Sequence, residues 1–161
     1  MKHADYCTHI NNNEDEDILT RPNFNVNMRL FHANKEYKAL ILSLCAYICR
    51  CASTSKEGYK PPHGWSGANA GIPFNIIAFH VCGLTLTWIN PVITRYSKDI
   101  KMVRSNCGSL TLPQPKLITR SLSIDVEYYD LQGQQHLWKS IPPTPGFTIQ
   151  HEVEHTQGKL L

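Results

Sequence analysis

Two histidines four residues apart, His151 and His155, enclose a glutamate, Glu152, near the end of the chain. In a helix this spacing places both imidazoles on one face, about one turn apart. Two such rings can bind one metal ion while the carboxylate beside them acts on a metal-bound water. The same pattern also fits a solvated helix with two surface histidines. The metal interpretation predicts a hydrolytic site with His151 and His155 as ligands and Glu152 as the general base.

A catalytic site of this kind needs a third protein ligand and keeps one coordination position open. Only six residues follow His155, and none of them is a ligand type. The third ligand is therefore expected upstream, which argues against an ordinary zinc endopeptidase. Cys107, in a short polar turn between apolar segments, is the best candidate because a thiolate is a strong, soft ligand. The weaker alternatives are His63, His80 and His136.

The motif needs a helix, and the flanking residues are typical of one. Thr144 and Pro145 suit its first two positions, and Gly158 is a natural stop. An earlier helix is expected after Asn34, with Leu40, Leu44 and Ile48 on one face.

Between these helices the alternation of apolar and polar residues predicts strands. They cover residues 72–79, 86–89, 92–94 and 117–129, with a bend at Asn90-Pro91 and a turn at Gln132-Gly133. Residues 58–71 are rich in Gly and Pro and are expected to form a functional loop. The order of elements predicts an α+β fold with mixed or antiparallel sheets packed around the C-terminal helix, and one further N-terminal helix.

The length of 161 residues indicates one domain, here residues 18–161, preceded by a polar arm of residues 1–17. The net charge of +3 is too mild, and its basic residues too scattered, for a nucleic-acid surface. The longest apolar stretch, residues 39–49, is far shorter than the roughly 20 residues of a membrane span. Acidic residues near the start argue against a signal peptide, so the six cysteines are expected to be reduced thiols in a cytoplasmic, monomeric protein.

Three stretches of the chain resemble, in order and spacing, the three motifs of the peptide deformylases. Residues 150–160, QHEVEHTQGKL, resemble the family's Q-H-E-x-D-H-L-x-G-x-L closely. Residues 105–109, SNCGS, partly match E-G-C-L-S, and residues 64–71, GWSGANAG, loosely match G-L-A-A-P-Q-x-G. The chain ends just after the third motif, as the short bacteriophage versions of the family do, so the cytoplasm of an infected bacterial host is an expected location.

The resemblance implies a metal site and a reaction. Cys107, His151 and His155 would bind one divalent ion, which is Fe²⁺ in family members that also accept Zn²⁺, Ni²⁺ or Co²⁺. Glu152 would be the general acid and base. The implied reaction removes the formyl group from N-formyl-methionyl peptides of nascent proteins and releases formate, with no direct contact to nucleic acid or membrane.

The resemblance also implies how the substrate is held. The backbone N–H of Gly108 and the side-chain amide of Asn69 would bind the formyl oxygen, and the backbone of Gly64 would help to hold the peptide. Asn69 stands where the family has glutamine, so its amide is expected to stop about 1.5 Å short, the length of one carbon–carbon bond. The alternative is that Gly67 and Gly71 let the loop move inward and restore the contact. Ser105 replaces the glutamate that pairs with an arginine in the family, so Arg120, in that arginine's place, is expected to lose its partner.

Two other functions fit the same residues. The first is a metal-dependent amidase with a different acyl substrate. The second is a metal-binding homologue without turnover, which the changes at Asn69 and Ser105 favour.

Overall fold

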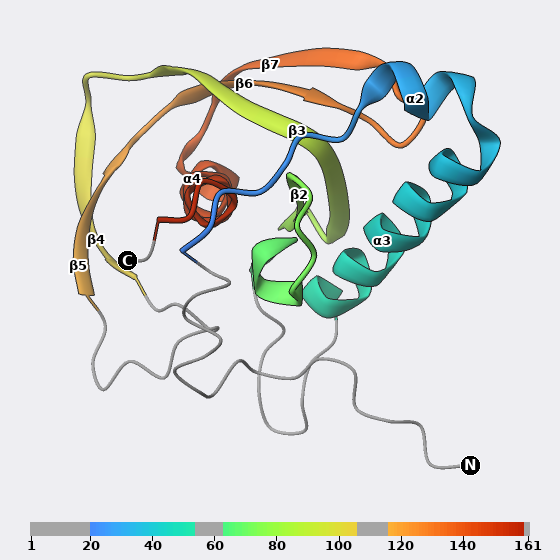
Figure 1. Ribbon diagram of the computed structural model, residues 1–161. Coiled ribbons are helices and arrows are strands. Elements are labelled where there is room, and N and C mark those ends of the chain that lie inside the picture. Colours follow the sequence, from blue (N-terminus) through green and yellow to red (C-terminus); the bar gives the residue numbers. More distant parts are fainter. Residues whose placement is uncertain (1–19, 54–62, 106–115, 160–161) are drawn as a thin grey trace.

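The computed structural model describes residues 20–53, 63–105 and 116–159 (Figure 1). In chain order the elements are α2 (Met28–Ala33), α3 (Lys35–Ser53), β1 (Gly64–Ser66), the 3-10 turn η1 (Ala68–Ala70), β2 (Ile76–Val81), β3 (Leu84–Tyr96), β4 (Ile100–Ser105), β5 (Lys116–Ser121), β6 (Ile124–Tyr129), β7 (Gln135–Ile141) and α4 (Pro143–Thr156). The predicted α+β class is confirmed, and the helix with the histidines is α4.

The strands form two antiparallel sheets that enclose α4. One sheet has the order β1-β2-β3-β6-β7, and the other is the β4–β5 hairpin. Figure 1 shows α4 end-on, with the strands β3, β6 and β7 passing above it, β2 on one side and the β4–β5 hairpin on the other. The helix is therefore held by strands from both sheets.

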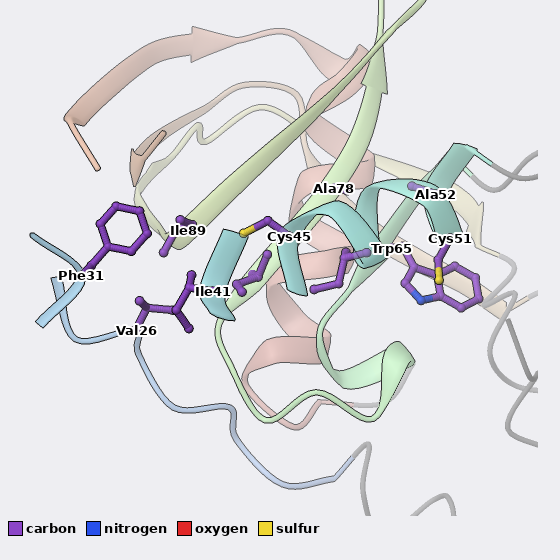
Figure 2. Close-up of a cluster of buried hydrophobic side chains, with 11 residues drawn as sticks. Val26, Phe31, Ile41, Cys45, Cys51, Ala52, Trp65, Ala78 and Ile89 are labelled. Atoms are coloured by element: carbon purple, nitrogen blue, oxygen red, sulfur yellow. The ribbon is translucent and has the colours of Figure 1, made fainter. Parts of the chain in front are cut away.

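Strand β2 carries apolar side chains on both faces, and this divides the core in two. Because side chains alternate along a strand, Ile76 and Ala78 face the α3 side while Ile77 and Phe79 face α4. The first cluster includes Phe31, Ile41, Cys45, Trp65 and Ile89, all of which Figure 2 labels. The second includes Trp88, Ile124, Val126, Ile141, Ile149 and Val153. The apolar residues of α4 thus fix the helix against the larger sheet.

The predicted limits of several strands are wrong. The Asn90-Pro91 bend is a bulge inside the single strand β3, where the register with β6 shifts between Ile89 and Val92. Asn90 has a positive φ of 52°, and its side chain accepts from Val26 N at 2.7 Å and donates to Val26 O at 2.8 Å. In contrast, the predicted strand of residues 117–129 is two strands, β5 and β6.

The helix ends agree in part with the sequence. Asn34 Oδ1 accepts from Tyr37 N at 2.9 Å at the start of α3, as expected of a capping residue. The start of α4 differs from the prediction, because the helix begins at Pro143 and Thr144 lies inside it, with extended backbone angles of −111° and 110°. At the other end, Gly158 follows the last turn of α4 with a φ of 72°, as expected.

The predicted loop of residues 58–71 is more regular than expected where it is described, because it contains β1 and η1. Residues 58–62 and the polar arm of residues 1–17 lie outside the described part of the chain, so the arm and the domain limits stay predictions. No helix in the described ranges is long and apolar enough to cross a membrane.

Candidate metal centre

Helix α4 brings His151 and His155 together. Their Nε2 atoms lie 3.0 Å apart, and the ring centroids are separated by 4.5 Å with the planes at 85°. Two nitrogens bound to one tetrahedral zinc, each with a bond of about 2.0–2.1 Å, lie about 3.3 Å apart. The two imidazoles therefore have almost the spacing that a shared metal ion requires.

The remaining candidate ligands do not join this pair. His80 Nε2 lies 2.7 Å from Ala52 O, and His136 Nε2 lies 2.7 Å from Asp130 Oδ2. Within the described ranges no group of three or more His, Cys, Asp and Glu side chains is arranged to hold a metal. Cys107, the predicted third ligand, and Gly108 both lie outside the described residues.

Both imidazoles are uncharged at neutral pH. Burial lowers the pKa of His151 to about 3, with the neighbouring His155 and Arg120 acting in the same direction. Burial likewise lowers the pKa of His155 to about 4, against the raising effect of Glu154. A neutral imidazole keeps the lone pair with which it binds a metal, so protons compete little for these nitrogens.

The Glu152 carboxyl is enclosed by protein. Glu152 is 4% exposed, and burial raises the pKa of its carboxyl group to about 8. Among the described residues its Oε2 has no hydrogen-bond partner. A buried carboxylate without a partner is costly, and a cation with its water beside His151 supplies what this oxygen lacks. The two neutral imidazoles, with this carboxyl group beside them to accept a hydrogen bond from a metal-bound water, therefore fit a divalent metal ion.

Gly64 places strand β1 directly against α4. A Cβ at this position would lie 2.6 Å from Thr148 Cγ2 and 2.9 Å from both Cγ and Oε1 of Glu152. Only glycine fits there without displacing its neighbours. Sequence reasoning expected Gly64 to contact a substrate, and the structure adds that it packs against Glu152.

Asn69 lies in η1, which also contacts α4, and is 4% exposed. Its Oδ1 accepts a hydrogen bond from Ser66 N at 3.0 Å and another, very short one from the Ser66 hydroxyl. Ser66 thus holds the carbonyl oxygen of the Asn69 amide. Its contact with a formyl oxygen stays a prediction.

Arg120 was expected to lose the partner that the family has at position 105, but in the structure it pairs with a different residue. Its Nη1 donates to Glu154 Oε1 at 2.5 Å, and the two side chains are 5% and 25% exposed. The partner comes from α4 itself, one residue before His155. The sequence signal for this pair is an acidic residue inside the histidine motif, but the strand that carries Arg120 is 34 residues away.

Gln150 is a second residue whose position was not recognised from the sequence. It is 2% exposed, its Oε1 accepts from Ser121 N at 3.1 Å, and its Nε2 donates to Ser121 O at 2.9 Å and to Gly146 O at 3.2 Å. Its place beside His151 was the only signal in the sequence.

The sequence is similar to those of known proteins. A family model for polypeptide deformylase matches residues 12–161. The peptide deformylase of Rickettsia prowazekii (strain Madrid E) is 32% identical over 74 residues, which are 45% of this chain and 41% of that protein. The chain thus spans about two fifths of the length of the curated relatives that it matches.

Solved structures share the fold. PDF from the Vibrio parahaemolyticus bacteriophage VP16T, in complex with actinonin, has a TM-score of 0.68 at 22% identity, over 89% of this chain and 93% of that one. Arabidopsis thaliana peptide deformylase 1B has a TM-score of 0.72 at 20% identity, over 95% of this chain and 78% of that one. At these identities the likeness concerns the fold. Because the family match covers nearly the whole sequence, the chain belongs to the polypeptide deformylase family.

Proposed function

We propose that this chain is a metal-dependent hydrolase that removes the formyl group from N-formyl-methionyl peptides of nascent proteins and releases formate. The observation that carries the proposal is the buried Glu152 carboxyl, with one oxygen lacking a hydrogen-bond partner among the described residues, beside two neutral histidines on the same helix. Membership of the polypeptide deformylase family supports it.

His151, His155 and Cys107 would hold one divalent ion. Fe²⁺ is the proposed ion, with Zn²⁺, Ni²⁺ and Co²⁺ as substitutes. When bound, such an ion acts as a Lewis acid and lowers the pKa of a water to about 7, so that a nucleophile is available near neutral pH. The depressed pKa values of the two histidines keep these side chains ready to bind it.

Glu152 then moves the proton. A divalent cation nearby would favour the ionised carboxylate of Glu152 and so oppose the effect of burial on its pKa. This carboxylate takes a proton from the water whose oxygen attacks the formyl carbon. As the bond between this carbon and the peptide nitrogen breaks, Glu152 returns the proton to the leaving amine, and formate and the free N-terminus result. The burial of Glu152 supports this role, because it keeps bulk water from exchanging with the transferred proton.

The remaining proposed residues bind the substrate. The backbone N–H of Gly108 and the amide of Asn69 would donate to the formyl oxygen as negative charge develops on it. The backbone of Gly64 would hold the peptide beside Glu152, and the close packing of Gly64 on that residue supports this placement. We also propose a monomer in the cytoplasm, with no direct contact to nucleic acid or membrane, in which residues 18–161 form the catalytic domain.

Formate release from formyl-Met-Ala-Ser by protein purified anaerobically with Fe²⁺ tests the proposal. We expect about one metal ion per chain and multiple turnovers, with no release of acetate from acetyl-Met-Ala-Ser. Metal binding without formate release would indicate the homologue without turnover. Preferential cleavage of another acyl group would indicate the different amidase.

A further inference from the structure

Three rows of side chains run along α4, and each has a different neighbour. Successive residues of a helix are about 100° apart around its axis, so residues four apart form a row. Ile149 and Val153 are fully buried in the core against the larger sheet. His151 and His155 form the candidate metal row. The row between them consists of Gln150 and Glu154, and both of these side chains reach strand β5.

The side-chain amide of Gln150 pairs with the backbone at the end of β5 through the same kind of N–H and C=O hydrogen bonds that join neighbouring strands. The amide accepts from the N–H and donates to the C=O of the same residue, Ser121, at 3.1 and 2.9 Å. A third hydrogen bond, to Gly146 O at 3.2 Å, ties the same side chain to the preceding turn of α4. The buried side-chain amide of Gln150 therefore fixes the distance between β5 and α4 and the position of Ser121 along the helix axis.

Arg120, the residue before Ser121, makes the second connection. Its guanidinium group donates to Glu154 at 2.5 Å. Among the described residues Arg120 Nη2 and Glu154 Oε2 are buried without hydrogen-bond partners, so one hydrogen bond links the two charged groups. A buried ion pair of this kind adds little to stability, because desolvation of the two charges offsets their attraction. What it does supply is a defined geometry between the two elements that carry it.

Strand β5 pairs with β4, so the contacts that fix β5 against α4 also fix the position of β4. Arg120 lies opposite Lys101, and the ladder continues to Ser105 opposite Lys116. Among the described residues, the position of the hairpin relative to the histidine row therefore depends on Gln150 and on the Arg120–Glu154 pair.

We propose that Gln150, Glu154, Arg120 and Ser121 form a polar clamp that holds the β4–β5 hairpin in register with the histidine row and thereby sets the geometry of the metal centre. Gln150 and Arg120 are positioning residues in this account. The inference rests on the proposed metal-dependent function. It differs from a purely stabilising role, because the apolar row of Ile149 and Val153 already anchors α4 to the larger sheet.

Two variants remove the two halves of the clamp. Gln150→Met keeps the length of the side chain and removes all three hydrogen bonds. The double variant Arg120→Met/Glu154→Leu removes both buried charges together, so that neither is left alone. The matched controls are Gln157→Met, an exposed glutamine at the end of the same helix, and Arg95→Met, which breaks the more exposed ion pair with Asp125.

Metal-free protein is titrated with Co²⁺, and the dissociation constant, the visible absorption spectrum of the bound ion and the thermal midpoint of the metal-free protein are recorded. The clamp predicts that each variant binds Co²⁺ about 10–100-fold more weakly than the parent and with an altered spectrum, as is typical for residues that orient metal ligands. The thermal midpoint of the double variant is expected to stay near that of the parent. Both controls are expected to match the parent in Co²⁺ affinity and spectrum, and Arg95→Met is expected to do so even though it loses the stabilising ion pair with Asp125.

Co²⁺ affinity and spectrum equal to those of the parent in both variants overturn the clamp, and so does a loss of affinity that only follows a loss of stability. If the double variant fails to fold, Gln150→Met decides alone. Co²⁺ binding and formate release by the parent protein distinguish a failure of this inference from a failure of the proposed function. A parent that binds Co²⁺ and releases no formate refutes the reaction and leaves the clamp to be judged by affinity, whereas a parent that binds no Co²⁺ refutes both.

Discussion

Gly64 and Glu152 are in direct contact: a Cβ on Gly64 would come within 2.9 Å of Glu152 Oε1. The strand and the helix meet here without a side chain between them. Because Gly64 has no Cβ, Glu152, the proposed general base, can lie directly against strand β1.

Gly64→Ala is expected to displace Glu152 and to lower the rate of formate release at least tenfold. The added methyl group also overpacks the contact with Thr148, and such overpacking destabilises by about 1–3 kcal/mol. Steady-state rates and thermal midpoints check this. Gly83→Ala is the control, because Gly83 has a φ of 80° with no atom within 4 Å of the added Cβ. It is expected to lose some stability and no activity, and an unchanged rate in Gly64→Ala contradicts the importance of this contact.

Asn69 is expected to be needed for its carbonyl oxygen as well as for its amide nitrogen. Asn69→Ala leaves the buried Ser66 N–H and hydroxyl without their acceptor, which costs about 1–3 kcal/mol of unfolding free energy. Asn69→Gln moves this oxygen by one methylene, so we expect it too to lower both stability and rate. Chemical denaturation and formate-release rates of both variants are the measurements. A faster reaction in Asn69→Gln would instead show that the shorter side chain fails to reach the substrate.

The site illustrates which parts of an active centre a sequence reveals. His151, Glu152 and His155 were recognised because their relation is local and a helix fixes it. The links from Gln150 to Ser121 and from Glu154 to Arg120 were missed because they join residues 29 and 34 positions apart. Strand β4 was not predicted at all, since it is partly exposed and mixes basic with apolar residues. The sequence predicts a bend at Asn90 instead of a bulge, because the bulge is stabilised by a hydrogen bond to Val26, which is distant in the sequence.

Acid is expected to remove part of the stability through Asp125. The two hydrogen bonds from Arg95, at 2.7 and 2.8 Å, and one from Ser140 N lower the pKa of this carboxyl to about 2. A pKa that is lower in the folded than in the unfolded chain stabilises the fold above the unfolded value of about 3.9, and this contribution is lost as the pH falls towards 2. The free energy of unfolding, measured by chemical denaturation over about four pH units from pH 6 to pH 2, should therefore depend less on pH in Asp125→Asn than in the parent. Asp99→Asn is the control, and identical pH profiles for the parent and Asp125→Asn contradict the assignment.

The cysteines of the described residues are expected to differ in reactivity. Burial, with Cys49 nearby, raises the pKa of Cys45 to about 12, so little of the reactive thiolate exists at neutral pH. Cys82 is exposed in the turn between β2 and β3. Brief treatment of the native protein with iodoacetamide, followed by peptide mass mapping, should label Cys82 and leave Cys45 unmodified. Labelling of Cys45 at the rate of Cys82 speaks against the packing of α3.

The central claim is that Glu152 transfers the proton in a metal-dependent deformylation, and Glu152→Gln tests it most directly. The substitution preserves the shape of the side chain and removes its ability to accept the proton. Metal content and formate release from formyl-Met-Ala-Ser are measured on the parent and the variant, both loaded with Fe²⁺ under anaerobic conditions. We predict an equal metal content and a turnover rate lower by about a hundredfold or more in the variant. Equal turnover by the two proteins contradicts the account.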